Sequence, residues 1–251
     1  MVQVNNLTKI YKSNKKNKTN EILATNNLSF QVSNNEIFGL LGPNGAGKTT
    51  TLRCISTLLA PTRGSITVND FNTVAHAKSV RQNICFLTNE IKLDDHFSPN
   101  YLIHFFGKLH GMNDQQLSER KTTLFNKLGI WEFKDKKISK LSTGMKQKAS
   151  IAISLIHDPS VIIFDEPTNG LDIITAKTVT DYLLELRAEG KTIILSTHIM
   201  DVASKLCDRI AVIINGSIHL TGSLEEILTH TKTNNLEEAF FQLYNKAVES
   251  C

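Results

Sequence analysis

The fold is decided by the stretch Gly42-Pro43-Asn44-Gly45-Ala46-Gly47-Lys48-Thr49. It fits the pattern G-x-x-x-x-G-K-[ST], and it lies between an apolar run at 37–41 and a helical pattern at 50–59, the context that this motif requires. Its glycines let backbone N–H groups turn toward phosphate oxygens, and the helix N-terminus adds positive partial charge. We therefore expect this loop, with Thr50, to bind a nucleotide. Lys48 would hold the β- and γ-phosphates, and the Thr49 hydroxyl would face Mg²⁺.

Two carboxylates follow another apolar run, at 161–164. Ligands of α/β sheets bind at the carboxyl ends of the strands, so Asp165 and Glu166 are expected at the same edge as the loop. Asp165 suits the surroundings of Mg²⁺, and Glu166 suits a base that polarises the attacking water. His198 follows the apolar run 192–195, and its neutral imidazole could bridge a γ-phosphate oxygen and that water.

Short apolar runs alternate with helical patterns along most of the chain, which predicts a parallel α/β sheet covered on both faces. Helical character replaces this alternation from 94 to 157; Ser98-Pro99 begins one predicted helix, and Gly129 ends another over 114–128. At the N-terminus, runs at 2–4 and 28–32 predict strands that enclose a polar hairpin tip, 12–20. We predict a single domain, 1–251, with three parts. Residues 1–92 and 159–230 form an α/β core with an N-terminal antiparallel β subdomain. Residues 93–158 form an inserted helical subdomain, and residues 231–251 form a C-terminal helical extension.

Composition narrows the class of protein further. The 251 residues are 41% hydrophobic, and no apolar run approaches the length of about 18 residues that spans a bilayer. The N-terminal residues do not form a signal peptide pattern, so we expect a cytoplasmic protein. Residues 1–35 contain five lysines and one acidic residue, which accounts for the whole net charge of +4. Because the remainder is neutral, we expect no nucleic acid partner.

A second anion-binding pattern precedes the carboxylates: Leu141-Ser142-Thr143-Gly144-Met145-Lys146-Gln147-Lys148. Ser142 is a good N-cap for the apolar helix that follows, and Gly144 leaves backbone N–H groups open to an anion. Taken alone, these residues fit an ordinary capped core helix equally well.

This segment resembles the LSGGQ signature of the ATP-binding cassette (ABC) ATPases. The phosphate loop, the run ending in Asp165-Glu166-Pro167, Gly170-Leu171-Asp172 and His198 also stand in that family's order. The resemblance covers essentially the whole chain and implies a P-loop NTPase cassette with a RecA-like core that hydrolyses ATP with Mg²⁺. It further implies a head-to-tail dimer, either a homodimer, which we expect, or a heterodimer. In such a dimer, Ser142, Thr143 and Gly144 of one chain close on ATP held by the other chain, and Asp172 lies at the seam.

Three further features refine the resemblance. Tyr11 matches the aromatic residue that stacks on adenine in this family. Asn89 stands where the family usually has the Q-loop glutamine; it is one methylene shorter and would reach Mg²⁺ through water. Asn89, the signature Ser-Thr-Gly-Met and the ending 236–243 resemble the ABC-2 exporter branch that includes sodium-extruding NatA-type ATPases.

The resulting expectation is an ATPase subunit that powers an ABC-2-type exporter of sodium, a drug, or a lipid or polysaccharide precursor. It would pair with a second ATPase subunit and with a separately encoded transmembrane permease, on the inner face of the membrane. One alternative is a soluble ABC ATPase that acts on ribosomes or nucleic acid; the single phosphate loop and neutral body argue against it. Another alternative is a subunit that binds ATP but does not hydrolyse it. The presence of Lys48, Asp165, Glu166 and His198 argues against this alternative.

Overall fold

The computed structural model describes residues 1–15, 18–88 and 93–249. Within these ranges the strands form two sheets, one four-stranded in the order β2-β1-β4-β5 and one six-stranded in the order β10-β9-β3-β8-β7-β6. The strands are β1 Val2–Lys15, β2 Lys18–Val32, β3 Ile37–Leu41, β4 Arg63–Val68, β5 Phe71–Asn72, β6 Ile84–Thr88, β7 Val161–Asp165, β8 Thr192–Thr197, β9 Arg209–Ile214 and β10 Ser217–Gly222.

The six-stranded sheet is parallel except for its edge strand β10, which pairs antiparallel with β9. Strands β3 and β7 are buried at every position. Strands that are covered on both faces need apolar residues throughout, which explains their continuous apolar runs. The predicted parallel core is therefore confirmed, and its strands bring their carboxyl ends to one edge.

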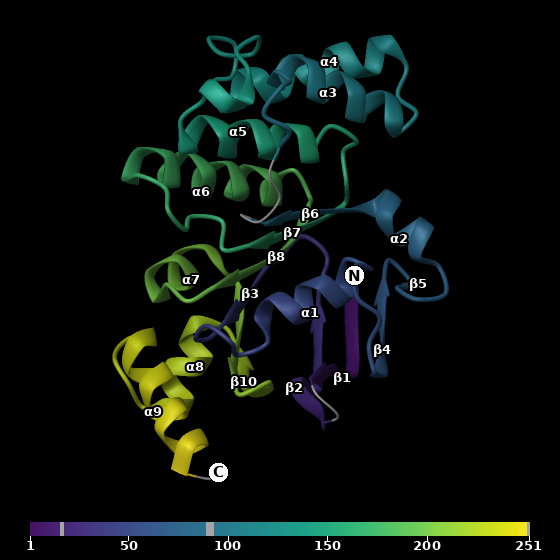
Figure 1. Cartoon of the computed structure of the whole chain (residues 1–251). Helices are drawn as coiled ribbons and strands as arrows, with labels where there is room; N and C mark the ends of the chain where they lie inside the picture. Colours follow the sequence, from purple (N-terminus) through teal and green to yellow (C-terminus); the bar gives the residue numbers. More distant parts are fainter. Residues whose placement is uncertain (16–17, 89–92, 250–251) are drawn as a thin grey trace.

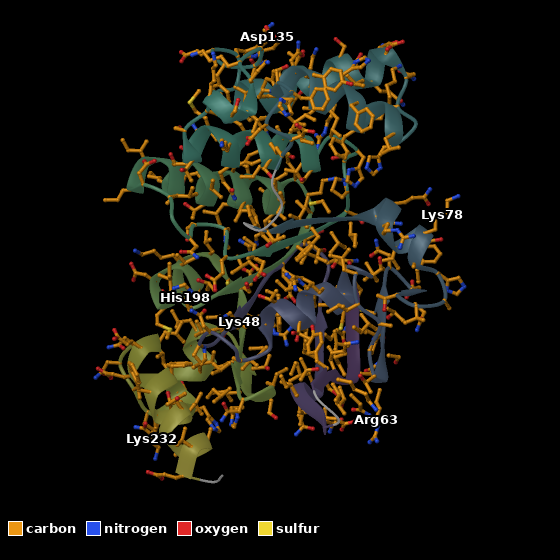
Figure 2. The ribbon with its side chains drawn as sticks, viewed as in Figure 1. Lys48, Arg63, Lys78, Asp135, His198 and Lys232 are labelled. Atoms are coloured by element: carbon orange, nitrogen blue, oxygen red, sulfur yellow. The ribbon has the colours of Figure 1, made fainter. Side chains whose placement is uncertain are left out.

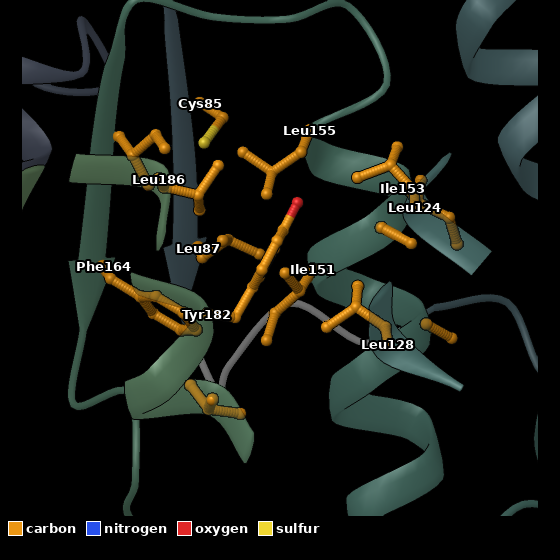
Figure 3. Packing of buried hydrophobic residues seen from close by; sticks show 14 of the residues in the cluster. Cys85, Leu87, Leu124, Leu128, Ile151, Ile153, Leu155, Phe164, Tyr182 and Leu186 are labelled. Carbon is orange, nitrogen blue, oxygen red and sulfur yellow. The ribbon is translucent and has the colours of Figure 1, made fainter. Parts of the chain in front are cut away.

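Helices cover one face of this sheet, and α1 with the four-stranded sheet covers the other (Figure 1). The helices are α1 Lys48–Ile55, α2 Ala77–Asn83, α3 Pro99–Leu109, α4 Asp114–Leu128, α5 Thr143–Ser154, α6 Ile173–Ala188, α7 Met200–Leu206, α8 Leu224–Thr231 and α9 Leu236–Glu249, with a 3₁₀ turn at Ile138–Lys140. Phe164 of β7 contributes to the core under α5 and α6, whereas its neighbour Ile163 contributes to the core on the opposite face. Figure 3 shows Tyr182 of α6 between Phe164 and Ile151 of α5.

Local capping signals fix the helices between β6 and β7. The Ser98 side chain accepts a hydrogen bond from the Tyr101 N–H at the start of α3. Asn113 and Gln116 form a reciprocal capping box at α4, which ends at Gly129 in the left-handed conformation. The helix predicted over 114–128 is confirmed. Helices α3, α4 and α5 pack together around a core continuous with that of the sheet.

Two elements differ from their predicted extents. Helix α1 ends at Ile55 rather than 59, because Thr57 adopts a left-handed φ of 65° that stops the helix. Strands β1 and β2 extend well beyond 2–4 and 28–32, and they pair as far as Lys15 with Lys18. Within this ribbon, Lys12 Nζ lies 3.1 Å from Glu21 Oε1 of the paired residue. The sequence lacks an alternating apolar pattern over this ribbon, but antiparallel strands pair through backbone hydrogen bonds, which do not depend on that pattern.

The C-terminal helices α8 and α9 pack on β9 and α7. Their core includes Ile227, Ala239 and Leu243 together with Val212 of β9. No helix in the described part of the chain is long and apolar enough to cross a membrane.

Candidate functional site

The phosphate loop connects the end of β3 to the first turn of α1 and can take its shape only with glycine at two positions. Gly47 has a φ of +102°, and a Cβ added there would lie 2.4 Å from the Ala24 carbonyl oxygen. A Cβ on Gly42 would lie 2.2 Å from the carbonyl oxygen of Ile213 in β9. Both glycines let the loop pass directly against neighbouring backbone, so the loop is held from two sides.

Lys48 points back into this loop. Its ammonium group donates to the carbonyl oxygens of Gly42 (2.7 Å) and Pro43 (3.1 Å), and its side chain is only 6% exposed. Burial lowers the pKa of Lys48, and the carboxylates of Glu166 and Asp165 oppose that shift. The loop, Ala24 and Glu166 line a pocket of about 180 Å³. A buried cation at the start of a helix gives this pocket the electrostatics that a phosphate group needs.

The first carboxylate, Asp165, ends β7 and is almost completely buried. Its Oδ2 atom accepts a hydrogen bond of 2.8 Å from the Thr49 hydroxyl, and its Oδ1 atom accepts one from the Ser196 hydroxyl. Hydroxyl and carboxylate oxygens are the ligands that Mg²⁺ prefers. The described residues contain no group of three or more His, Cys, Asp or Glu placed to hold a metal.

The second carboxylate, Glu166, lies between a lysine and a histidine. Its Oε1 atom is 3.6 Å from Lys48 Nζ, and both of its carboxylate oxygens are 3.0 Å from His198 Nδ1. In the view of Figure 2, Lys48 and His198 lie near each other. The side chains of Lys48 and His198 are therefore both in contact with that of Glu166, next to Asp165 and Thr49.

Tyr11 reaches the same region from the other sheet. Its hydroxyl shares a hydrogen bond of 3.4 Å with the Thr50 hydroxyl, and Lys9 Nζ lies 5.7 Å from the centre of its ring. An aromatic ring thus stands beside the phosphate loop, where a base attached to bound phosphates could stack on it.

The signature residues have different neighbours. The Ser142 side chain caps α5 by accepting from the Met145 N–H (3.3 Å). A Cβ on Gly144 would lie 2.7 Å from Thr175 Oγ1, whose hydroxyl donates to Asp172 Oδ2 at 2.7 Å. Ser142, Thr143 and Gly144 are not among the described residues that line the phosphate-loop pocket. Asn89, the remaining predicted metal contact, lies outside the described residues.

Ser196 belongs to the site, although the sequence patterns do not point to it. It is completely buried in β8 beside Asp165, and its hydroxyl contacts both consecutive carboxylate residues. The only local signal is a polar residue near the end of an apolar run, two positions before His198.

Together, the fold and the site define a P-loop nucleotide-binding α/β protein. The family model for ABC transporters matches residues 25–169. The chain is 37% identical to the ABC transporter ATP-binding protein NatA of Bacillus subtilis over 220 residues, covering 87% of this chain and 89% of that protein. It is also 37% identical to the Nod factor export ATP-binding protein I of Ralstonia nicotianae, covering 81% of this chain and 63% of that protein.

Solved structures agree with this result. The dimeric, post-hydrolysis structure of the ATP-binding cassette MJ0796, bound to ADP and Pi, superimposes with a TM-score of 0.80 at 26% identity, covering 89% of this chain and 99% of that chain. The chain belongs to the ABC transporter family. The predicted family, cassette fold and ATPase class are therefore confirmed.

Proposed function

We propose that this chain is the ATP-hydrolysing subunit of an export transporter whose membrane path is formed by a separate, ABC-2-type permease. The observation that carries the proposal is the cluster at the phosphate loop: Lys48 and His198 flank Glu166, and Thr49 contacts Asp165. The similarity to NatA and to the Nod factor export protein supports a role in export. We expect the chain to lie on the inner face of the membrane through that permease.

Each residue of the cluster has a chemical role in this proposal. The backbone N–H groups of 42–47 and the Lys48 ammonium hold the β- and γ-phosphates, and Tyr11 stacks on adenine. Thr49, Asp165 and, through water, Asn89 face Mg²⁺, which neutralises charge on the β- and γ-phosphates when bound. Glu166 orients the attacking water and accepts its proton while the new P–O bond forms and the bond to the β-phosphate oxygen breaks. His198, held against Glu166, faces the γ-phosphate.

A second subunit completes the site. The N-terminus of α5, with Ser142, Thr143 and Gly144, contacts α6 rather than the pocket of its own chain, so its open N–H groups are available to ATP held by a partner. The dimeric state of the MJ0796 cassette supports this arrangement. ATP would then bind the closed dimer more tightly than the open one, and this difference in affinity is what can drive a permease between two states.

The chain is divided into subdomains with different roles in this proposal. We infer that 93–158 is a helical subdomain that carries the signature, that 1–92 and 159–230 form the ATP-binding core with its β subdomain, and that 231–251 is a helical extension. The mutual packing of α3, α4 and α5 supports 93–158 as a subdomain. The packing of α8 and α9 on β9 supports 231–251 as an extension of the core.

Replacement of the proposed base tests the function. Glu166→Gln keeps the size of the side chain but removes its capacity to accept a proton, so we expect ATP turnover to fall at least a hundredfold. ATP affinity should stay within a few-fold of the wild-type value in a nucleotide-binding titration. Glu237→Gln, at an exposed position of α9, is the matched control and should hydrolyse ATP normally. Unchanged ATPase activity in Glu166→Gln would contradict the assignment.

A further inference from the structure

Ser196 links the two consecutive carboxylates of the site. It lies in β8 directly beside Asp165 of the parallel strand β7, and none of its surface is exposed. A serine hydroxyl has one proton and two lone pairs, so it can donate one hydrogen bond and accept others at the same time. Here it donates to Asp165 Oδ1 and accepts from the Glu166 N–H at 3.2 Å.

These two contacts act on different parts of the site. With Oδ1 of Asp165 bound by Ser196, the other oxygen, Oδ2, faces the Thr49 hydroxyl at 2.8 Å. The Glu166 N–H is held by the Ser196 hydroxyl and also by the Ser196 carbonyl oxygen, each at 3.2 Å. Glu166 has a left-handed φ of 54°, a conformation that few non-glycine residues adopt without such support. Its side chain leaves the backbone toward Lys48 and His198 from that fixed peptide.

The end of the same strand also touches the phosphate loop. The carbonyl oxygen of Thr197 accepts a hydrogen bond of 3.3 Å from the Gly42 N–H. One short segment of β8 therefore contacts the loop, the aspartate and the glutamate, and Ser196 is the residue in it whose side chain contacts both carboxylate residues.

We propose that Ser196 is a positioning residue for ATP hydrolysis: its hydroxyl orients the Asp165 carboxylate toward Thr49 and fixes the peptide from which the Glu166 carboxylate projects. This inference rests on the proposed function of the site. Ser196 is placed to act through Asp165 and Glu166 rather than on the nucleotide itself. Its loss should therefore affect turnover and the requirement for Mg²⁺ more than the binding of ATP.

Two substitutions and one control test the role. Ser196→Ala deletes the hydroxyl. Ser196→Cys keeps nearly the same size but offers only a weak donor and acceptor, so it remains informative if the alanine variant does not fold. Thr192→Val is the matched control, because Thr192 is also buried in β8 but its hydroxyl accepts from the Asn35 N–H at the opposite end of the strand.

Steady-state ATPase assays over a range of ATP and Mg²⁺ concentrations give the readout, with thermal unfolding as a check on the fold. We expect both Ser196 variants to lose about tenfold to a hundredfold in kcat, the scale of a small misplacement of reacting groups. KM for ATP should stay within about threefold, half-saturation by Mg²⁺ should need several-fold more metal, and Thr192→Val should behave as wild type.

The outcomes separate this inference from the proposed function. A wild-type chain that does not hydrolyse ATP overturns the proposed function, and this inference with it. A hydrolysing wild type together with a folded Ser196→Cys variant that keeps wild-type kcat and Mg²⁺ dependence overturns the positioning role alone. If Thr192→Val loses as much kcat as the Ser196 variants do, the effect comes from the packing of β8, and the positioning role is also overturned.

Discussion

Two stacked histidines show how burial sets the charge of a single residue. The rings of His110 and His157 lie parallel, with centroids 3.9 Å apart, where the end of α3 meets the segment after α5. His157 Nε2 is 3.1 Å from the Ile84 carbonyl oxygen, a contact that suits a neutral ring with its proton on Nε2. Burial, and to a smaller extent the neighbouring His110, lowers the pKa of His157 to about 4. The nearby Asp158 opposes this shift.

This low pKa predicts a loss of stability in mild acid. The unfolded chain takes up a proton on His157 near pH 6.5 but the folded chain only near pH 4, so the stability contributed by the neutral ring disappears as the pH falls through that window. The loss amounts to at most about 3.5 kcal/mol, at about 1.4 kcal/mol per pKa unit. Burial also lowers the pKa of His110, which adds a loss of the same sign.

Urea unfolding between pH 7 and pH 4.5 measures this effect. His157→Gln retains a group that can donate to the Ile84 carbonyl but does not titrate, so its stability should fall less steeply with acid than that of the wild type. His96→Gln removes an exposed histidine and serves as the control. Parallel pH curves for the wild type and His157→Gln would show that this ring is not responsible.

At the scale of elements, the loop between β3 and α1 lies directly against the backbone of neighbouring strands. Gly47 and Gly111 both have positive φ, but only a Cβ at Gly47 meets other atoms, because the Ala24 carbonyl oxygen of β2 would be 2.4 Å away. Substitutions at these two glycines therefore separate two free-energy costs: that of a left-handed backbone in a non-glycine residue, and that of a steric clash with β2.

We expect Gly111→Ala to destabilise the protein by about 1–2 kcal/mol and to leave ATP binding unchanged, because it imposes only the left-handed penalty. Gly47→Ala should destabilise it more and should weaken ATP binding at least tenfold, since the loop must move away from β2. Thermal unfolding and a nucleotide titration measure the two effects. Equal behaviour of the two variants would mean that the contact with β2 does not hold the loop.

The elements that sequence alone predicts are those with local signals. The phosphate loop, the helix over 114–128 and the runs that end at Asp165 and before His198 are recognisable because motif, cap and apolar pattern lie within a few residues. The early end of α1 was not predictable, because nothing in the neighbouring residues requires the positive φ of Thr57. The contacts of Ser196 depend on the register between β7 and β8, which joins residues far apart in the chain.

At the scale of the whole molecule, the signature and the phosphate loop face different surroundings within one chain. In the proposed dimer, each phosphate loop meets the partner's signature. Ser142→Asp allows a direct test, because aspartate caps a helix as well as serine does but places a negative charge where phosphate would approach.

Mixing variants reveals whether the site is shared. Lys48→Met and Ser142→Asp should each be inactive alone, but a mixed dimer contains one site with an intact Lys48 and an intact Ser142. We therefore expect the mixture to regain part of the wild-type ATPase activity. A mixture of Lys48→Met with Glu166→Gln contains no intact site and is the control. If activity does not return in the first mixture while exchange of subunits is demonstrated by labelled chains, a shared site is excluded.

The place of β3 in the sheet has a consequence for how the protein is made. A ribosome completes the phosphate loop early, yet the two sheet neighbours of β3 are β8 and β9, where Ile37 pairs with Ile193 and Phe38 with Arg209. Until those strands emerge, the nascent chain carries a fully apolar strand with unpaired backbone, the kind of segment that chaperones bind and that aggregates. A chain cut short before Thr192 would thus contain the complete nucleotide motif but neither sheet neighbour of β3, and it would be unable to build the site.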